Sequence, residues 1–254
     1  MIETKIIDVN EDNITECPPK CFMNPKNEGY KKKVLWLKKQ FKQGLKIKLI
    51  YKVKENKCIG FIEYIPGENA WRAVESPDYL FIHCIWISPN IYKNLGHGSL
   101  LVNECLMDAK KGKKSGVAVV TSEGSFMAGK DLFIKNGFKS IQHEEPSYEL
   151  LIKKIKTSKL PKFKNWKNQL NNYNGWNVLY SYQCPWVVRS INDIVKISKK
   201  YRLELKLIEL KSAEDAQNAP SIYSTFNLIY NGRLLADHYI SSRRFENILK
   251  KELK

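Results

Sequence analysis

The chain has no long apolar run. None of its 254 residues fall in a stretch approaching the roughly 18–20 consecutive apolar residues that a membrane-spanning helix needs. Residues 1–10 alternate like a strand and lack the basic-then-apolar layout of a signal peptide. We therefore expect a soluble, cytoplasmic protein with no membrane partner.

Cysteine and histidine are too scattered to indicate a disulfide framework or a metal site. Cys58, Cys84 and Cys105 sit inside apolar runs, where cysteine behaves as a small hydrophobe, so a reducing compartment is expected. Cys17 and Cys21 have a spacing found in zinc sites, but no second Cys/His pair lies nearby. We expect no metal, and a redox pair or two loop thiols that touch substrate are the alternatives.

Acidic residues are scarce, with 26 against 43 basic ones, a formal charge of +17. The excess is concentrated in residues 153–175, which hold seven lysines and no acid. A nucleic-acid-binding segment is one interpretation. We prefer a solvated, lysine-rich connector and expect no nucleic-acid partner.

Hydrophobic periodicity divides the chain into two α/β domains. Residues 1–155 predict the order strand, helix, three strands, helix, strand, helix and two strands. Turn-forming residues and lysines mark residues 156–175 as a basic linker. Residues 176–254 predict strand, helix, strand, short helix, a hairpin turning at Asn231-Gly232, and a final helix. No internal repeat is evident.

The most informative stretch is a buried strand, Tyr79–Ser88, that runs through a glycine-containing loop into a helix. Such a loop directs several backbone N–H groups at one point, and the helix N-terminus adds roughly half a positive charge. Gly96 and Gly98 remove side chains that would block close approach of a ligand to the backbone. The stretch therefore indicates an anion site suited to a pyrophosphate.

Two ordered motifs resemble the signatures of the GNAT N-acetyltransferases. Lys93 to Gly98 resembles their Gln/Arg-x-x-Gly-x-Gly/Ala motif, and Ala128 to Phe138 resembles a second signature that ends in Gly-Phe. The resemblance implies a mixed sheet flanked by helices, with acetyl-CoA as co-substrate. It implies that the pantetheine arm pairs along Ile85, Trp86 and Ile87. It places the pyrophosphate on Lys93, Asn94, Leu95, Gly96, His97, Gly98 and Ser99.

Phe133 departs from this family resemblance. Many members carry a tyrosine at this position, which protonates the departing CoA thiolate, whereas phenylalanine has no proton to give. Phe133 is therefore expected to contact the cofactor without acting as an acid. Another group or water then supplies the proton, the thiolate leaves unprotonated, or the domain binds acyl-CoA with little turnover.

The reaction that the resemblance implies is direct attack of an amine on the thioester, which requires a base. Alternation along Tyr79–Ile87 puts His83 on the same face as Ile85 and Ile87, and histidine titrates near neutrality. Glu123, just after a predicted strand, is the second candidate base. Glu63, Trp71 and Arg72 are predicted to line the acceptor pocket. A satisfied buried histidine, an exposed loop acid and a salt-bridged surface arginine are the structural alternatives.

The C-terminal element order resembles a smaller thioredoxin-like α/β domain. Cys184 lies at the start of a predicted helix, where a thiol pKa is lowered, and is a reactive thiol candidate. Pro220 is placed like the cis-proline of that fold. Val187 stands where a second cysteine is usual, which excludes a two-cysteine cycle within this motif. Monothiol chemistry remains open, and a structural or binding role is preferred.

The pairing of the two domains resembles the YoaP-like acetyltransferases of bacteria. This implies transfer of an acetyl group from acetyl-CoA to a primary amine of a small molecule or peptide. The alternative is an acyl-CoA-sensing or thiol-linked binding protein with little turnover. The acceptor and the oligomeric state are not fixed by the sequence.

Overall fold

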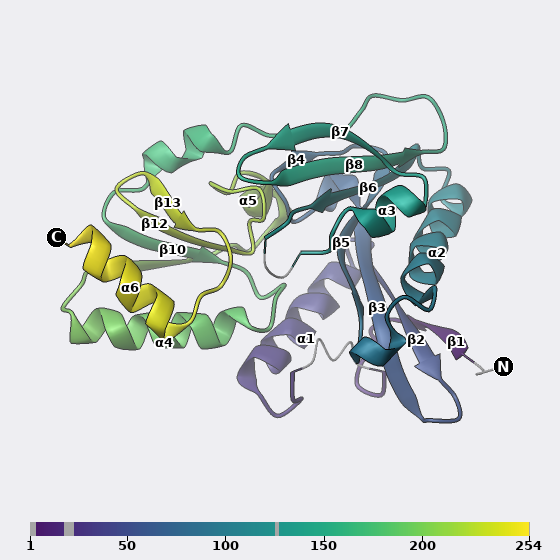
Figure 1. Cartoon of the computed structure of the whole chain (residues 1–254), viewed down its shortest axis with the longest axis horizontal. Coiled ribbons are helices and arrows are strands. Elements are labelled where there is room, and N and C mark those ends of the chain that lie inside the picture. The colour runs from purple at the N-terminus through teal and green to yellow at the C-terminus, as the bar shows by residue number, and fades with distance from the viewer. Residues whose placement is uncertain (1–3, 18–22, 125–126, 254) are drawn as a thin grey trace. The chain divides into compact units, whose positions relative to one another are not determined.

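The helices and strands follow the hydrophobic periodicity of the sequence closely. The computed structural model describes residues 4–17, 23–124 and 127–253 (Figure 1). The chain forms two compact units, and neither is a continuous segment. One comprises residues 1–21, 37–70 and 75–162, and the other comprises 22–36, 71–74 and 163–254. Two short N-terminal segments thus belong to the second unit, whereas the sequence predicted contiguous domains.

A seven-stranded mixed sheet forms the first unit, in the order β1-β2-β3-β5-β6-β8-β7. Its strands are β1 (Thr4–Val9), β2 (Lys46–Lys52), β3 (Lys57–Pro66), β5 (Tyr79–Ile87), β6 (Gly116–Thr121), β7 (Lys139–Glu144) and β8 (Tyr148–Lys154). Strands β5 and β6 run parallel, and the other described pairs are antiparallel. The other elements are α1 (Glu28–Phe41), α2 (His97–Lys111), α3 (Asp131–Lys135) and the 3₁₀ helices η1 (Gly67–Asn69) and η2 (Asn90–Tyr92). The predicted mixed sheet flanked by helices is confirmed.

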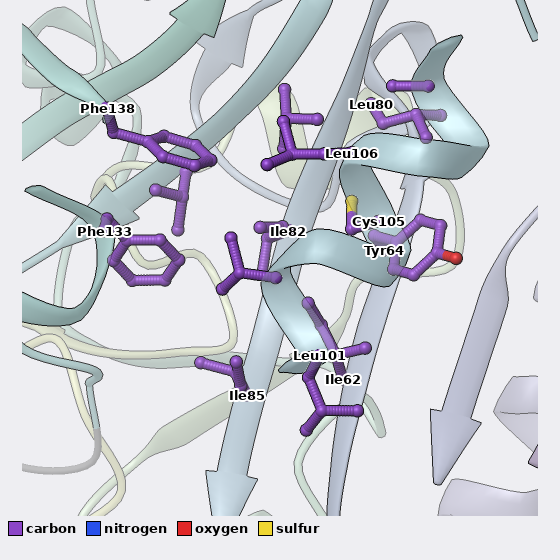
Figure 2. Packing of buried hydrophobic residues seen from close by; sticks show 14 of the residues in the cluster. Ile62, Tyr64, Leu80, Ile82, Ile85, Leu101, Cys105, Leu106, Phe133 and Phe138 are labelled. Atoms are coloured by element: carbon purple, nitrogen blue, oxygen red, sulfur yellow. The ribbon is translucent and has the colours of Figure 1, made fainter. Parts of the chain in front are cut away.

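Helix α2 packs on one face of this sheet. Its apolar residues recur at helical spacing, so Leu101 and Cys105 project from one side and are fully buried. Figure 2 shows them against Ile62 of β3 and Ile82 of β5. Burying such side chains supplies about 25 cal/mol per Å² of apolar surface, which fixes α2 over the centre of the sheet.

The second unit contains a four-stranded sheet in the order β11-β10-β12-β13. Its elements are β10 (Trp176–Tyr180), α4 (Val187–Lys200), β11 (Leu205–Glu209), α5 (Ala213–Gln217), β12 (Phe226–Tyr230), β13 (Arg233–Ala236) and α6 (Ser242–Glu252). Helices α4 and α6 share one core cluster with β10 and β12. Both turn residues of the β12–β13 hairpin have positive φ, 46° at Asn231 and 71° at Gly232, as the sequence predicted.

The lysine-rich segment contains two short regular elements, and its residues are mostly exposed or half-buried. It contains β9 (Lys162–Phe163), which pairs with β4 (Val74–Glu75), and the 3₁₀ helix η3 (Lys167–Asn172). Lys159 and Lys162 contact Glu75 at 2.8 and 3.2 Å. Two lysines of the segment thus share one carboxylate that lies outside it.

Among the described residues, no helix is both long and apolar enough to cross a membrane.

Candidate active site

The two parallel strands at the centre of the first sheet separate before either strand ends. Their pairing runs from Tyr79 opposite Gly116 to Ile82 opposite Val119 and then stops. Strand β5 continues to Ile87, and β6 continues to Thr121 while it pairs with β8 on its other side. The edge of β5 beyond Ile82 therefore has no strand partner in the described sheet, which leaves backbone groups for a ligand.

The register of β3 and β5 identifies which backbone groups face that edge. The N–H of Ser88 donates to the carbonyl of Ile59 at 2.8 Å. Alternate residues of an antiparallel pair direct both backbone groups at the partner strand, so Trp86 and Cys84 face β3. The N–H and C=O groups of Ile85 and Ile87 consequently point to the open edge.

A β-bulge lies where β5 leaves β6. Glu63 pairs with Cys84 and Tyr64 pairs with Ile82, so His83 is an extra residue in β5. The bulge shifts the alternation of side chains by one position. Ile82 and Ile85 both enter the α2 core, as Figure 2 shows for their side chains.

The predicted orientation of His83 is therefore wrong, since simple alternation had put it beside Ile85 and Ile87. Its imidazole lies on the Glu63 face of the sheet, with Nδ1 3.3 Å from Oε1 of Glu63. Both side chains are 0% exposed. The ring of Phe81 meets the imidazole edge-on, with centroids 5.9 Å apart. A bulge of this kind leaves no mark in the hydrophobic pattern, so the sequence could not reveal the pair.

The glycine-containing loop leads from β5 through η2 into α2. Asn94 and Gly96 both have positive φ, at 61° and 83°. A Cβ atom at Gly96 would meet nothing within 4 Å, so the glycine leaves open space at the helix N-terminus. The positive φ explains why glycine is suited to the position, since the open space alone would admit a side chain.

The N-terminus of α2 is favourable for a negative group. The first backbone N–H groups of a helix have no intrahelical acceptor, and Gly96 supplies no side-chain cap. The first turn carries no acid. Burial, followed by the charge of Lys52, lowers the pKa of His97, which lies in this turn. Lys93 lies over the ring of Trp86, 5.4 Å from its centroid.

Two residues in the first turn of α2, Gly98 and Ser99, lie against α3 and the residue that ends it. A Cβ atom at Gly98 would come within 3.0 Å of Leu132, so this glycine permits close packing of the two helices. Ser99 Oγ accepts a hydrogen bond of 3.0 Å from the amide of Asn136. The sequence did not reveal this contact of Asn136, because it shows only that Asn136 and Gly137 end a helix.

Phe133 is a core residue in this structure. Its side chain is 0% exposed and packs edge-on against Phe138, with centroids 5.4 Å apart (Figure 2). A ring in this position fills the space between α3 and the sheet.

The other predicted site residues lie in different surroundings. Glu123 is exposed after β6, and its backbone N–H donates to Ser147 Oγ at 3.3 Å. Trp71 and Arg72 belong to the second unit and are 2% and 3% exposed. Arg72 Nη1 donates to Gln183 Oε1 at 2.6 Å. Glu63, by contrast, belongs to the first unit.

Cys184 does not have the low pKa that its helix position predicted. Burial raises the pKa of its thiol to about 11, and this outweighs hydrogen bonds from the backbone of Trp186 and Val187 and the charges of Lys33 and Arg72. Removing a thiolate from water costs more than the helix terminus returns. The raised pKa is consistent with the preferred structural or binding role and weighs against Cys184 as a reactive thiol.

The expected cis-proline at Pro220 is also wrong. The cis peptide bonds among the described residues precede Pro89 and Pro146, so the Ala219–Pro220 bond is trans. The two isomers of an X–Pro bond differ by only about 0.5–1 kcal/mol, so sequence position alone does not decide between them.

The described residues contain no group of three His, Cys, Asp or Glu side chains that could hold a metal ion. Cys17 is a free thiol there. Its proposed partner Cys21 lies outside the described residues.

Comparison with known proteins gives a consistent assignment over both units. The chain matches a model described as the acetyltransferase (GNAT) family over residues 12–138, and one described as YoaP-like over residues 204–247. It is 30% identical over 249 residues to the uncharacterized N-acetyltransferase YoaP of Bacillus subtilis (strain 168), spanning 96% of this chain and 97% of that protein.

The solved structures to which the chain is similar include two acetyltransferases. One is a GNAT-family acetyltransferase from Staphylococcus aureus Mu50, with a TM-score of 0.42 and 17% identity, covering 61% of this chain and 100% of that one. The other is the PaiA N-acetyltransferase from Thermoplasma acidophilum in complex with coenzyme A, with a TM-score of 0.43 and 15% identity, covering 60% and 99%.

Proposed function

Since the chain belongs to the acetyltransferase (GNAT) family, we propose that it acetylates a primary amine of a small molecule or peptide. The protein is an acetyltransferase, and the enzymes of this family use acetyl-CoA as the acetyl donor. The acceptor class, the residues that bind the donor and the catalytic base are the parts that we propose here.

The open edge of β5 is the observation that carries the proposal. Its backbone groups at Ile85 and Ile87 lie on the strand that leads to the N-terminus of α2. An extended pantetheine arm can pair with such an edge as an additional strand. The diphosphate then fits the N–H groups of residues 93–99, where the missing side chain of Gly96 leaves space. The backbone groups at the edge of β5 and in residues 93–99 therefore suit acetyl-CoA.

His83 is the base that we favour. It is the first residue of β5 beyond the last pair with β6, next to the proposed path of the pantetheine. A neutral imidazole can take the proton that the attacking amine must lose. Backbone N–H groups at the open edge can polarise the thioester carbonyl. Glu123 remains the second candidate.

The leaving thiolate needs no tyrosine in this scheme. A thiol pKa near 8.5, by analogy with cysteine, makes the CoA thiolate a tolerable leaving group. The imidazolium of His83 is a further source of the proton. Phe133 is then a packing residue under the donor site, which its complete burial supports.

The donor site is tested by placing a charge at Gly96. Gly96→Asp puts a carboxylate at the proposed phosphate position, whereas Gly96→Asn has the same shape, tolerates the same positive φ and is neutral. We expect Asp to weaken acetyl-CoA binding at least about tenfold relative to Asn, which is about 1.4 kcal/mol. Isothermal titration calorimetry measures both. Equal dissociation constants for the two variants would mean that the phosphates bind elsewhere.

Turnover and the base are tested together with a thiol-release assay over a panel of primary amines. We expect release with at least one amine, a loss of about 10²–10⁴-fold for His83→Asn, and little change for Glu123→Gln. Binding of acetyl-CoA without release for any amine would favour the sensing alternative. The reverse pattern in the two variants would assign the base to Glu123.

For the second unit we propose a thioredoxin-like fold with a structural or binding role. The order β10-α4-β11-α5-β12-β13-α6 supports this, with β10 and β11 parallel and the β12–β13 hairpin antiparallel. The raised pKa of Cys184 favours the binding role over monothiol chemistry. Trp71 and Arg72 are buried within this unit, so an acceptor-lining role for them remains a prediction.

A further inference from the structure

We propose that Lys52 and Lys57, at the end of the β2–β3 hairpin, belong to the donor site and attract the phosphate groups of acetyl-CoA by their charge. The inference rests on the proposed function, in which the diphosphate lies at residues 93–99. It adds two ammonium groups to a site that is otherwise formed mainly by backbone N–H groups. No direct contact with the phosphates is required, because charges act over several ångströms.

The two lysines lie directly opposite each other in the hairpin, where Lys52 of β2 pairs with Lys57 of β3. Like charges at directly opposite positions of an antiparallel pair are destabilising. Glu55, between the two strands, offsets part of this repulsion, since its carboxylate accepts a hydrogen bond from Nζ of Lys52. One carboxylate against two ammonium groups leaves a net positive charge, which an anionic ligand nearby would offset.

Tyr92 connects this charged hairpin end to the loop before α2. Nζ of Lys52 lies 4.7 Å from the centroid of the Tyr92 ring, and Nζ of Lys57 lies 5.5 Å from it. The Tyr92 hydroxyl donates a hydrogen bond to Glu55. The Tyr92 side chain is itself buried in the core cluster that includes α2. These contacts hold both ammonium groups beside the residue at which η2 ends and the loop begins.

The charge of Lys52 reaches the N-terminus of α2. The rings of Tyr92 and His97 have their centroids 6.5 Å apart, and His97 is the first residue of α2. Burial lowers the pKa of His97, and the charge of Lys52 lowers it further, because a positive charge disfavours a second one nearby. The same field favours an anion and adds to the positive end of the helix dipole.

The test measures acetyl-CoA binding to variants of the full-length protein by isothermal titration calorimetry. Lys52→Met removes the charge and keeps the length of the side chain, whereas Lys52→Arg keeps the charge. At 50 mM NaCl we expect Met to raise the Kd about 5–20-fold and Arg to stay within about threefold of wild type. The loss in Lys52→Met should shrink to about twofold at 0.5 M NaCl, because salt screens the attraction.

Lys46→Met is the matched control. Lys46 lies at the other end of β2, about 20 Å from Lys52 at about 3.3 Å per strand residue, and it also contacts a carboxylate of α2. This separation exceeds the Debye length at 50 mM NaCl, which is about 14 Å, so the acetyl-CoA Kd should change by less than about twofold.

Glu55→Gln separates attraction by charge from mechanical support of the loop. Glutamine keeps an oxygen that can accept from Lys52 and Tyr92 but removes the negative charge. We expect acetyl-CoA to bind this variant as tightly as wild type or more tightly, because the positive charge is no longer offset. Lys57→Met, at an exposed position where folding is not at risk, should weaken binding about 2–5-fold.

The two lysines would have no role in the donor site if Lys52→Met bound acetyl-CoA as tightly as wild type while Gly96→Asp and Gly96→Asn differed as expected. Equal weakening in Lys52→Met and Glu55→Gln would show that the cluster supports the loop mechanically, which also overturns the inference. Equal dissociation constants for the two Gly96 variants would instead reject the donor site itself, and the role of the lysines with it.

Discussion

At the scale of single residues, burial influences which protonation state a side chain adopts, and the residue type alone does not fix that state. His83, Glu63 and Cys184 can each donate, accept or carry charge. Glu63 and His83 share a dry contact, whereas Cys184 is half-buried with no carboxylate or imidazole among the groups that shift its pKa. Burial thus brings Glu63 and His83 into contact away from water, and it raises the pKa of the Cys184 thiol.

The reactivity of Cys184 should follow its raised pKa. With a pKa of about 11, the thiolate is a minor species at pH 8 and increases about tenfold per pH unit up to pH 10. We expect the alkylation rate of Cys184 to rise in the same proportion, measured by peptide mass spectrometry with iodoacetamide. The exposed Cys84 serves as an internal reference and should react first. A rate for Cys184 that levels off near pH 7 would restore the low-pKa interpretation.

At the scale of elements, charged groups fix α2 across β2 and β3. Asp108 of α2 contacts Lys46 at 2.8 Å and accepts a hydrogen bond of 2.7 Å from the hydroxyl of Tyr64. Lys48, which is 8% exposed, contacts Glu104 at 3.1 Å. These bonds complement the apolar face of α2 and orient the helix whose N-terminus forms the proposed phosphate site.

Asp108 should contribute stability that depends on pH. Burial alone would raise the pKa of this carboxyl, but hydrogen bonds from Lys46 and Tyr64 and the charge of Lys48 hold it below its ordinary value. A depressed pKa in the folded state means that the stabilisation is complete above the unfolded pKa, about 4, and is lost as the pH falls through the folded value.

We therefore expect Asp108→Asn to lower the free energy of unfolding by about 1–3 kcal/mol at pH 7, measured by urea denaturation. The difference from wild type should begin to shrink below about pH 4 and should be lost once the pH falls below the depressed folded pKa, where the carboxyl is protonated and uncharged like the amide. Asp12→Asn, at an exposed position, is the control and should change stability by less than about 0.5 kcal/mol. An effect of Asp108→Asn that is constant from pH 7 to pH 3 would exclude the electrostatic explanation.

At the scale of the whole molecule, the two units interleave along the chain. The segment 71–74 lies between β3 and β5 in sequence but belongs to the second unit. There the N–H of Lys164 donates to the carbonyl of Ala73 at 2.9 Å, and the guanidinium of Arg72 lies over the ring of Tyr223. The C-terminal unit is thus completed by residues from the N-terminal half of the chain.

Arg72 should stabilise the second unit, although it is far from that unit in sequence. Arg72→Ala leaves buried Gln183 without a charged donor, and we expect a loss of about 1–3 kcal/mol in the unfolding free energy. Lys200→Ala removes an exposed ion pair with Glu246 in the same unit and should cost less than about 1 kcal/mol. Hydrogen exchange measured over residues 176–254 would locate the effect. Equal losses for Arg72→Ala and Lys200→Ala would mean that the segment contributes no special stability.

Several features of the molecule were predictable because they depend on local pattern. The strands and helices of both units follow from periods of two and 3.6 in hydrophobicity, and Asn231-Gly232 specified its hairpin. The loop at Gly96 and the second signature near Gly137 pointed to the family. The family's element order then placed the open strand edge.

Other features depend on contacts between distant residues. The face occupied by His83 depends on a register shift against β3, which no period along β5 records. The partners of Arg72 and the pKa of Cys184 depend on segments far away in sequence. The isomer of the Ala219–Pro220 bond likewise depends on the surrounding packing.

The sequence by itself determined most of the elements, their order and the glycine-containing loop before α2, because alternating apolar side chains and glycine conformations act within a few residues. Only the tertiary structure decided that Glu63 faces His83, that Cys184 stays protonated, and that segments 22–36 and 71–74 belong to the C-terminal unit. The physical reason is that strand register and burial are set by groups that meet only after the chain has folded.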